Sequence, residues 1–144
     1  MQNPPPVQVS SQPPVQAGKS STGLDENIAA LLSYIFGWVS GLIFFLIEKD
    51  SRLVRFHAMQ SLLFNVLVGV VLIALWIVLF VVFMIASQIS GALTTLLSLV
   101  SLLIWGVFGL AVLAGFILCL VKAFQGQYFK LPLIGNFAEK FSAK

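Results

Sequence analysis

The sequence predicts an all-α membrane protein with three transmembrane helices and a C-terminal amphipathic helix that lies in the membrane interface. Two uncharged runs predict this class: 66 residues from Phe56 to Val121, and 21 residues from Asn27 to Ile47. A charge at the bilayer centre costs about 2.5 to 3.5 kcal/mol on insertion scales, so lipid selects for such runs. The composition agrees, because only 9% of the residues are charged and the mean hydropathy is +1.02.

Residues 1–22 are predicted to be a disordered tail, and residues 23–144 a single helical transmembrane domain. The tail is rich in Pro, Gln and Ser and has no period that could bury one face of a helix or strand. It does not resemble a signal peptide, because the first apolar run begins only near Ile28 and is too long.

The first predicted span covers residues 28–47. Twenty helical residues extend about 30 Å, which matches the thickness of the hydrocarbon core. The segment from Glu48 to Arg55 then holds five of the thirteen charged residues of the chain. We expect this loop to lie in water or among the lipid headgroups.

The longer uncharged run must turn at least once, because a single helix of that length would extend about 99 Å. Small polar residues and a glycine come together only in the segment from Ser87 to Gly91. We therefore expect the second span at about residues 60–86 and the third at about residues 95–121. A fourth span would need another turn within an apolar stretch that has no such breaker.

The distribution of basic residues predicts that the N-terminus lies outside and the C-terminus in the cytoplasm, because cytoplasmic loops carry the excess of Lys and Arg. With three spans, Lys19 is the only basic residue on the outer side. The first loop and the C-terminal segment hold the others, Lys49, Arg52, Arg55, Lys122, Lys130, Lys140 and Lys144.

Small and polar residues recur about every four positions in each span, which is typical of helices whose backbones approach closely. The stripes comprise Ala29, Ser33, Gly37 and Gly41; Ser61, Asn65 and Gly69; and Ala111, Gly115 and Cys119. We interpret them as helix-packing faces within one chain. The alternative is that some of them line a substrate path or join subunits.

Each predicted span also has a tryptophan near its middle, at Trp38, Trp76 and Trp105. Tryptophan in membrane proteins usually favours the two interfaces. We interpret the three as bulky packing around the glycines, and an aromatic ligand site is the alternative.

The C-terminal segment is predicted to form a short amphipathic helix at about residues 132–143, after Gly126 and Pro132 end the third span. Leu133, Ile134, Phe137 and Phe141 would share its apolar face, and lysines its polar face. Such a helix lies flat in the interface, with anionic cytoplasmic headgroups as its partner. A protein-binding role is the alternative.

Two segments carry a resemblance to a known family. The sequence from Phe44 to Asp50, followed by Val54 to Leu62, and the closing segments from Gln125 to Tyr128 and Leu131 to Gly135 resemble a family of small prokaryotic membrane proteins of unknown function. That family is similar in turn to the Tic-twenty component of the chloroplast inner-envelope protein-import machinery. The resemblance implies a helical domain in the prokaryotic cell membrane and, more distantly, a connection with protein translocation.

The family signature comprises Arg55, Phe56, His57 and Gln60, where the second predicted span enters the membrane. We interpret these residues as contacts to headgroups and as anchors of the helix. The alternative is a proton-linked switch or a phosphate-recognition site, because an unperturbed His titrates near pH 6.5. Asn65 lies deeper, and we expect its amide to bond another helix.

We expect no enzyme, no cofactor and no metal site, because the chain has one His and no paired carboxylates within a span. The basic residues form no stripe for nucleic acid. The best hypothesis is a membrane scaffold or assembly factor that forms a homo-oligomer or binds another membrane protein. The alternative is a small transporter or channel subunit, suggested by His57, Asn65 and the glycines within the spans.

Overall fold

A computed structural model describes residues 18–142, so most of the predicted disordered tail lies outside the described residues. The described part contains five α-helices and confirms the all-helical class. They are α1 (Glu26–Ile35), α2 (Trp38–Ile47), α3 (Arg52–Ile89), α4 (Gly91–Phe124) and α5 (Gly135–Ser142).

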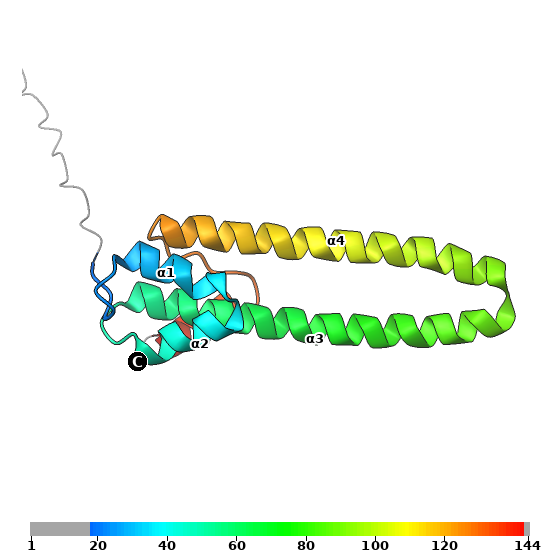
Figure 1. The fold of residues 1–144 in the computed structure, drawn as a ribbon, viewed down its shortest axis with the longest axis horizontal. Coiled ribbons are helices and arrows are strands. Elements are labelled where there is room, and N and C mark those ends of the chain that lie inside the picture. Colours follow the sequence, from blue (N-terminus) through cyan, green and yellow to red (C-terminus); the bar gives the residue numbers. More distant parts are fainter. Residues whose placement is uncertain (1–17, 143–144) are drawn as a thin grey trace, which may run out of the picture.

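Helices α3 and α4 form a long hairpin that extends beyond the rest of the molecule (Figure 1). They contain 38 and 34 residues, and both are long and apolar enough to cross a membrane. The turn lies at Ser90, whose backbone is extended and whose side chain caps α4 by accepting from the Leu93 amide at 3.2 Å. This confirms the predicted breaker between the second and third spans, and each predicted span lies within its helix.

The predicted first span is not one continuous helix. It divides into α1 and α2, of ten residues each, and each is about 15 Å long, half the thickness of the hydrocarbon core. The two helices run in opposite directions, so the end of α2 returns to the start of α1 (Figure 1). This corrects the predicted single span over residues 28–47. It also corrects a second prediction, because Lys19 and the loop after residue 47 were expected at opposite ends of that span and lie at the same end.

Gly37 makes the reversal between α1 and α2, with φ of +59° and ψ of −128°, a conformation open to glycine. Hydroxyl groups satisfy the backbone groups that the break leaves free. The Ser40 hydroxyl accepts from the Phe36 amide at 3.1 Å and donates to the Ser33 carbonyl at 2.9 Å. The Ser61 hydroxyl of α3 donates to the Gly37 carbonyl at 3.1 Å. The stripe from Ala29 to Gly41 is therefore interrupted at the turn.

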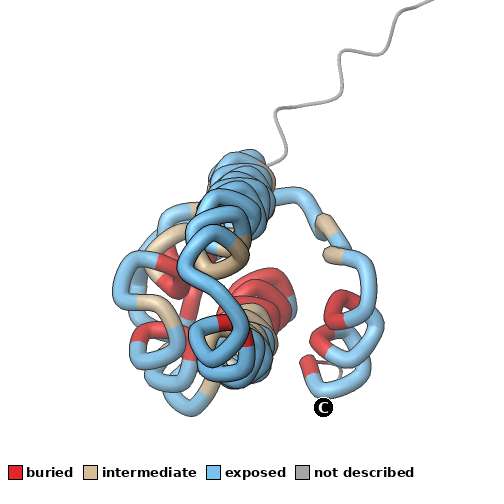
Figure 2. Tube along the Cα trace, turned by 90° about the vertical axis from the view of Figure 1, so that its right-hand side faces the viewer, coloured by how far each residue is buried: buried red, intermediate tan, exposed pale blue. Residues whose placement is uncertain are grey.

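We call the end of the molecule where α1, α2 and α5 pack on α3 the base; it comprises residues 18–65 and 116–142. The core of the base joins α1, α3 and α4 through Ala29, Ala30, Tyr34, Leu53, Val54, Cys119 and Ala123. Figure 2 looks along the molecule from the tip of the hairpin, where the nearer turns of α3 and α4 are mostly exposed. In a membrane, that exposed apolar surface faces lipid.

Helix α5 is shorter than predicted and begins at Gly135, three residues after Pro132. It packs through its small face, because Ala138 is fully buried and Ser142 is 6% exposed. Its aromatic side chains, Phe137 and Phe141, point away from the protein and are 59% and 49% exposed. This leaves two aromatic rings free to enter a lipid interface, as expected for an amphipathic surface helix.

The closest approach of α2 to α3 predicts a destabilising effect of a single methyl group. A Cβ atom at Gly41 would lie 2.8 Å from the Ala58 carbonyl oxygen and 3.1 Å from the Leu62 amide nitrogen. Gly41→Ala should therefore push the helices apart and lower the free energy of unfolding by about 1 to 3 kcal/mol. Reaction of the buried Cys119 thiol with a fluorogenic maleimide during heating measures the unfolding midpoint.

Gly69→Ala is the matched control, because a Cβ atom at this helical glycine meets nothing within 4 Å. It should leave the midpoint unchanged or raise it, since alanine favours the helix. Equal midpoints for the two variants would contradict the close α2–α3 contact.

Candidate functional site

The family-signature residues lie in the first turns of α3, inside the base. Ser51 caps this helix, since its hydroxyl accepts from the Val54 amide at 3.3 Å. The four side chains then contact different parts of the structure: Arg55 reaches α2, Phe56 and His57 reach the segment after α4, and Gln60 reaches α1 and α4. The signature is therefore the point at which the base is held together.

The turn between α2 and α3 is organised by the buried carboxylate of Glu48. Its oxygens accept hydrogen bonds from the Ser20 hydroxyl, from the Ser21 amide at 3.0 Å and from the Ser21 hydroxyl at 2.8 Å. The amides of Asp50 and Ser51 donate to the same group at 3.0 and 2.9 Å. These contacts tie the chain just before α1 to the turn just before α3, so residues 18–22 belong to the base.

Arg55 closes the end of α2. Its guanidinium Nη1 donates to the Glu48 carbonyl at 2.9 Å and lies 5.1 Å from the centre of the Phe45 ring. A cation near the last carbonyl groups of a helix is favourable because that end of the helix carries partial negative charge. Arg55 thus makes its contacts to Glu48 and Phe45 within the base, and the contact to headgroups stays a prediction.

His57 lies in a buried hydrogen-bond chain and is fully covered. Its Nε2 is 3.1 Å from the Gln127 carbonyl oxygen, and its Nδ1 is 3.1 Å from the Tyr34 hydroxyl. A carbonyl can only accept, so Nε2 carries the proton and donates. Burial lowers the pKa of His57 from 6.5 to about 4, so the imidazole is neutral at pH 7 and its Nδ1 accepts from the Tyr34 hydroxyl.

Gln60 extends this chain toward α4. Its Nε2 donates to the Tyr34 oxygen and to the Cys119 sulfur, both at 3.4 Å. Phe56 is fully buried beside it and stacks edge to face with His57, with ring centres 5.2 Å apart. These side chains join three helices and the segment after α4, and the Gln60 Oε1 atom is buried among them without a hydrogen-bond partner in the described part of the chain.

The predicted helix-packing residues have different environments. Ala29 and Ser33 are fully buried in α1. The Asn65 amide donates to the Ser61 carbonyl of its own helix at 2.8 Å, and its side-chain oxygen would lie 3.0 Å from a Cβ atom at Gly37. A Cβ atom at Gly115 of α4 would lie 3.5 Å from the Phe64 ring, whereas one at Gly69 would meet nothing within 4 Å.

Sequence reasoning missed Tyr34, Glu48 and Gln127 as parts of the site. Glu48 had a signal, because a carboxylate that follows an apolar helix and precedes a turn often accepts backbone hydrogen bonds. Tyr34 gave a weaker signal in the sequence, because it is the single tyrosine within an apolar run. Gln127 contributes a backbone carbonyl, which leaves no trace in the side-chain pattern.

The outer surface of the base carries charge and exposed aromatic rings. Every charged residue in the described part lies in the base, because residues 56–121 contain none. A groove of about 310 Å³ lies between the start of α3, the segment after α4 and α5, lined by Arg52, Tyr128, Glu139 and Ser142. Within residues 18–142, no three His, Cys, Asp or Glu side chains gather closely enough to hold a metal ion.

Comparison with known proteins gives one family. The family model described as the Magnetosome magnetite crystal formation protein family matches residues 24–138. UPF0132 membrane protein MJ1443 of Methanocaldococcus jannaschii is 38% identical over 125 residues, which cover 87% of this chain and 96% of that protein. A UPF0132 membrane protein of Archaeoglobus fulgidus is 32% identical over 117 residues, covering 81% of this chain and 95% of that protein.

No solved structure matches the chain. The relatives are named membrane proteins, which agrees with the predicted prokaryotic membrane family and with the two long apolar helices. The similarity to the Tic-twenty component is not shown by these comparisons and stays a prediction.

The hydrogen-bond chain predicts a specific cost for removing one hydroxyl group. Tyr34→Phe would leave His57 Nδ1 buried without a donor and remove an acceptor from Gln60. The free energy of unfolding should fall by about 1 to 3 kcal/mol. Thermal unfolding, followed by the reactivity of Cys119, measures this change.

Tyr128→Phe is the control, because Tyr128 is the only other tyrosine and is 56% exposed. An unfolding midpoint lowered equally by both substitutions would contradict a special role for the Tyr34 hydroxyl.

The hydrogen bonds to the Glu48 carboxylate predict that low pH destabilises this end of the protein. Burial alone would raise the pKa of Glu48, but hydrogen bonds from Ser20, Ser51 and Ser21 outweigh it and lower the pKa from 4.5 to about 2. Because the folded-state pKa is the lower one, this stabilisation is present above about pH 4.5 and is lost as pH falls toward 2. Unfolding midpoints measured by tryptophan fluorescence between pH 7 and pH 2.5 should show that loss.

Glu48→Gln should lower the midpoint at pH 7 and flatten its dependence on pH. Glu139→Gln is the control, since the ion pair of Glu139 with Lys130 is exposed on both sides and contributes little. A pH profile unaffected by Glu48→Gln would contradict the assignment.

Proposed function

The chain belongs to the Magnetosome magnetite crystal formation protein family, and from this premise we propose that it is a non-enzymatic membrane scaffold. In this proposal the hairpin of α3 and α4 anchors the protein in the bilayer, and the base receives a partner protein at the cytoplasmic surface. The single observation that carries the proposal is the fold-back of α1 and α2, which gathers the charged residues of the described part at one end.

The lengths of the helices support this placement. Helices α3 and α4 extend about 57 and 51 Å, whereas the bilayer with its headgroups is about 40 to 45 Å thick. One end must therefore project from the hydrocarbon, and that end is the base, because it carries the charge. Residues 66–86 and 95–115 then form the two spans, each of 21 residues and about 31 Å long.

The turn between α1 and α2 supports the same depth. Phe36 and Trp38 flank Gly37 and are 76% and 57% exposed. They lie level with Asn65, since Gly37 faces that side chain. The exposed tryptophan suits the boundary between headgroups and hydrocarbon, where tryptophan is enriched in membrane proteins. The base would therefore lie in the membrane interface, with Phe36 and Trp38 of the α1–α2 turn inserted among the lipids.

The excess of basic residues supports a cytoplasmic base. In the described part, the base has seven Arg and Lys residues, whereas the tip of the hairpin between residues 87 and 95 has none. Such an excess marks the cytoplasmic side. Both ends of the described chain would then lie in the cytoplasm, in place of the opposite sides that the sequence predicted.

The groove beside α5 is the proposed receiving surface. It brings Arg52 and Glu139 next to the exposed Tyr128 ring, and the Phe137 and Phe141 rings lie on the neighbouring helix. Arg and aromatic residues dominate the energetics of protein interfaces. The description of the family concerns magnetite crystal formation, and for this chain we propose a role in organising a membrane-bound assembly.

Site-specific photo-crosslinking in native membranes tests the proposal. A photoreactive phenylalanine analogue at Tyr128 should give adducts with a distinct protein, because this position faces the groove. The same group at Gln88, in the tip of the hairpin, is the control and should give none. Monomer alone at both positions, or passage of ions or small solutes through liposomes containing the purified protein, would contradict a scaffold role.

A further inference from the structure

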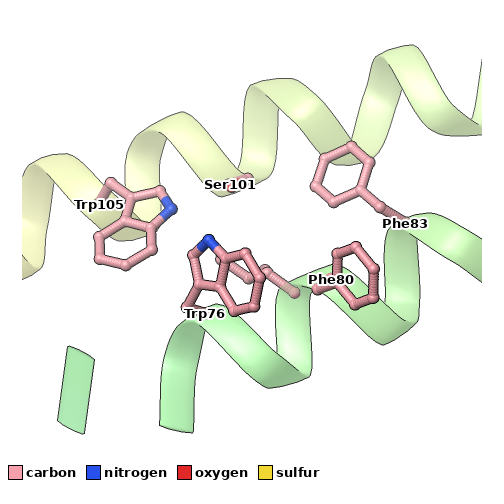
Figure 3. A pocket seen from close by; sticks show the side chains of 6 residues that line it. Trp76, Phe80, Phe83, Ser101 and Trp105 are labelled. Carbon is pink, nitrogen blue, oxygen red and sulfur yellow. The ribbon is translucent and has the colours of Figure 1, made fainter. Parts of the chain in front are cut away.

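Two tryptophans occupy an unusual depth in the hairpin. Trp76 is the central residue of the proposed span 66–86, and Trp105 is the central residue of the span 95–115. Tryptophan usually lies at the membrane interfaces, where its N–H group finds an acceptor. Because α3 and α4 are antiparallel, the two residues lie at the same level and line one groove (Figure 3).

The groove has a volume of about 270 Å³ and is almost entirely aromatic on the α3 side. Trp76 is stacked on Phe80, with ring centres 5.3 Å apart and an interplanar angle of 9°. Trp105 packs edge to face on Phe108 at 6.3 Å. Each indole is thus held by a neighbouring ring of its own helix. The remaining lining residues are Leu79, Phe83 and Ser101.

Indole N–H groups face this groove without an acceptor within residues 18–142. In Figure 3 the indole nitrogens of Trp76 and Trp105 both point into the space between the helices, near Ser101. No residue of the described part accepts a hydrogen bond from either indole. In hydrocarbon there is no water to replace the missing partner, so an unpaired donor is costly.

We propose that this groove binds a flat, lipophilic molecule that carries a carbonyl or ether oxygen. The aromatic walls favour a planar ring system, and the position in the middle of the bilayer requires an apolar compound. The oxygen would accept from the two indole N–H groups, one at each of its lone pairs. The volume of about 270 Å³ lies just below the range of about 300 to 1,000 Å³ for small-molecule sites, which suits a small compound of two or three fused rings. The inference rests on the proposed placement of the hairpin across the membrane.

A pair of matched probes tests the role of the oxygen. 9-Fluorenone and fluorene share one planar framework, and only the first has a carbonyl group. The excess of each compound retained by liposomes with protein, over liposomes without it, measures binding after correction for partition into lipid. We expect saturable binding of 9-fluorenone about tenfold tighter than that of fluorene, as expected for one hydrogen bond to a desolvated donor.

Conservative variants locate the donors. Trp76→Phe and Trp105→Phe keep an aromatic ring but remove the N–H group, and each should reduce the preference for the ketone to less than about threefold. Trp38→Phe is the matched control, because the third tryptophan of the chain lies in α2, away from the groove. Equal retention of the two probes, or a ketone preference that survives both substitutions, would overturn the proposal.

A depth measurement separates this inference from the placement on which it rests. In a Trp38→Phe, Trp105→Phe variant, Trp76 is the only tryptophan, and brominated lipids should quench it most when the bromine lies near the end of the acyl chain. Strongest quenching by shallow bromines would overturn the placement and the site together. Deep quenching without a ketone preference would overturn only the site.

Discussion

The buried carboxylate of Glu48 is the interaction on which the rest of the structure depends. It accepts hydrogen bonds from residues on both sides of the α1–α2 pair, and so it fixes the chain before α1 beside the turn before α3. A buried charge is tolerated only when it is fully hydrogen-bonded, and here the donors include backbone amides that cannot be repositioned without unfolding the turn. Once this contact forms, α1 and α2 cannot cross the bilayer as one helix.

The fold-back divides the protein into two parts with different chemistry. In the base, Tyr34, His57 and Gln60 join three helices through a buried hydrogen-bond chain. In the hairpin, the uncharged parts of α3 and α4, within residues 56–121, face lipid and share an aromatic groove. The proposed functions follow this division: the base offers a charged and aromatic surface to a protein, and the hairpin offers unpaired donors to a lipophilic molecule.

The sequence predicted the parts of the fold that depend on local chemistry. The uncharged run and the breaker at Ser87–Gly91 were sufficient to place α3 and α4, because length and hydropathy decide those helices. The break at Gly37 could not be predicted in this way. Residues 28–47 have the length and composition of a full span, and the hydroxyl of Ser61, which stabilises the reversal, lies 24 positions away in the chain. The signature residues could be located, but their partners at Tyr34 and Gln127 depend on tertiary contacts.

The distance between Lys19 and Lys49 tests the fold-back most directly. Both side chains are exposed, and the Lys49 amide donates to the hydroxyl of Ser21 at 2.9 Å, so nitroxide labels at Lys19→Cys and Lys49→Cys should lie within about 20 Å of each other. Cys119→Ala would remove the native thiol, and pulsed electron paramagnetic resonance in liposomes would measure the separation. A distance beyond about 30 Å, the length of a continuous helix over residues 28–47, would contradict the account.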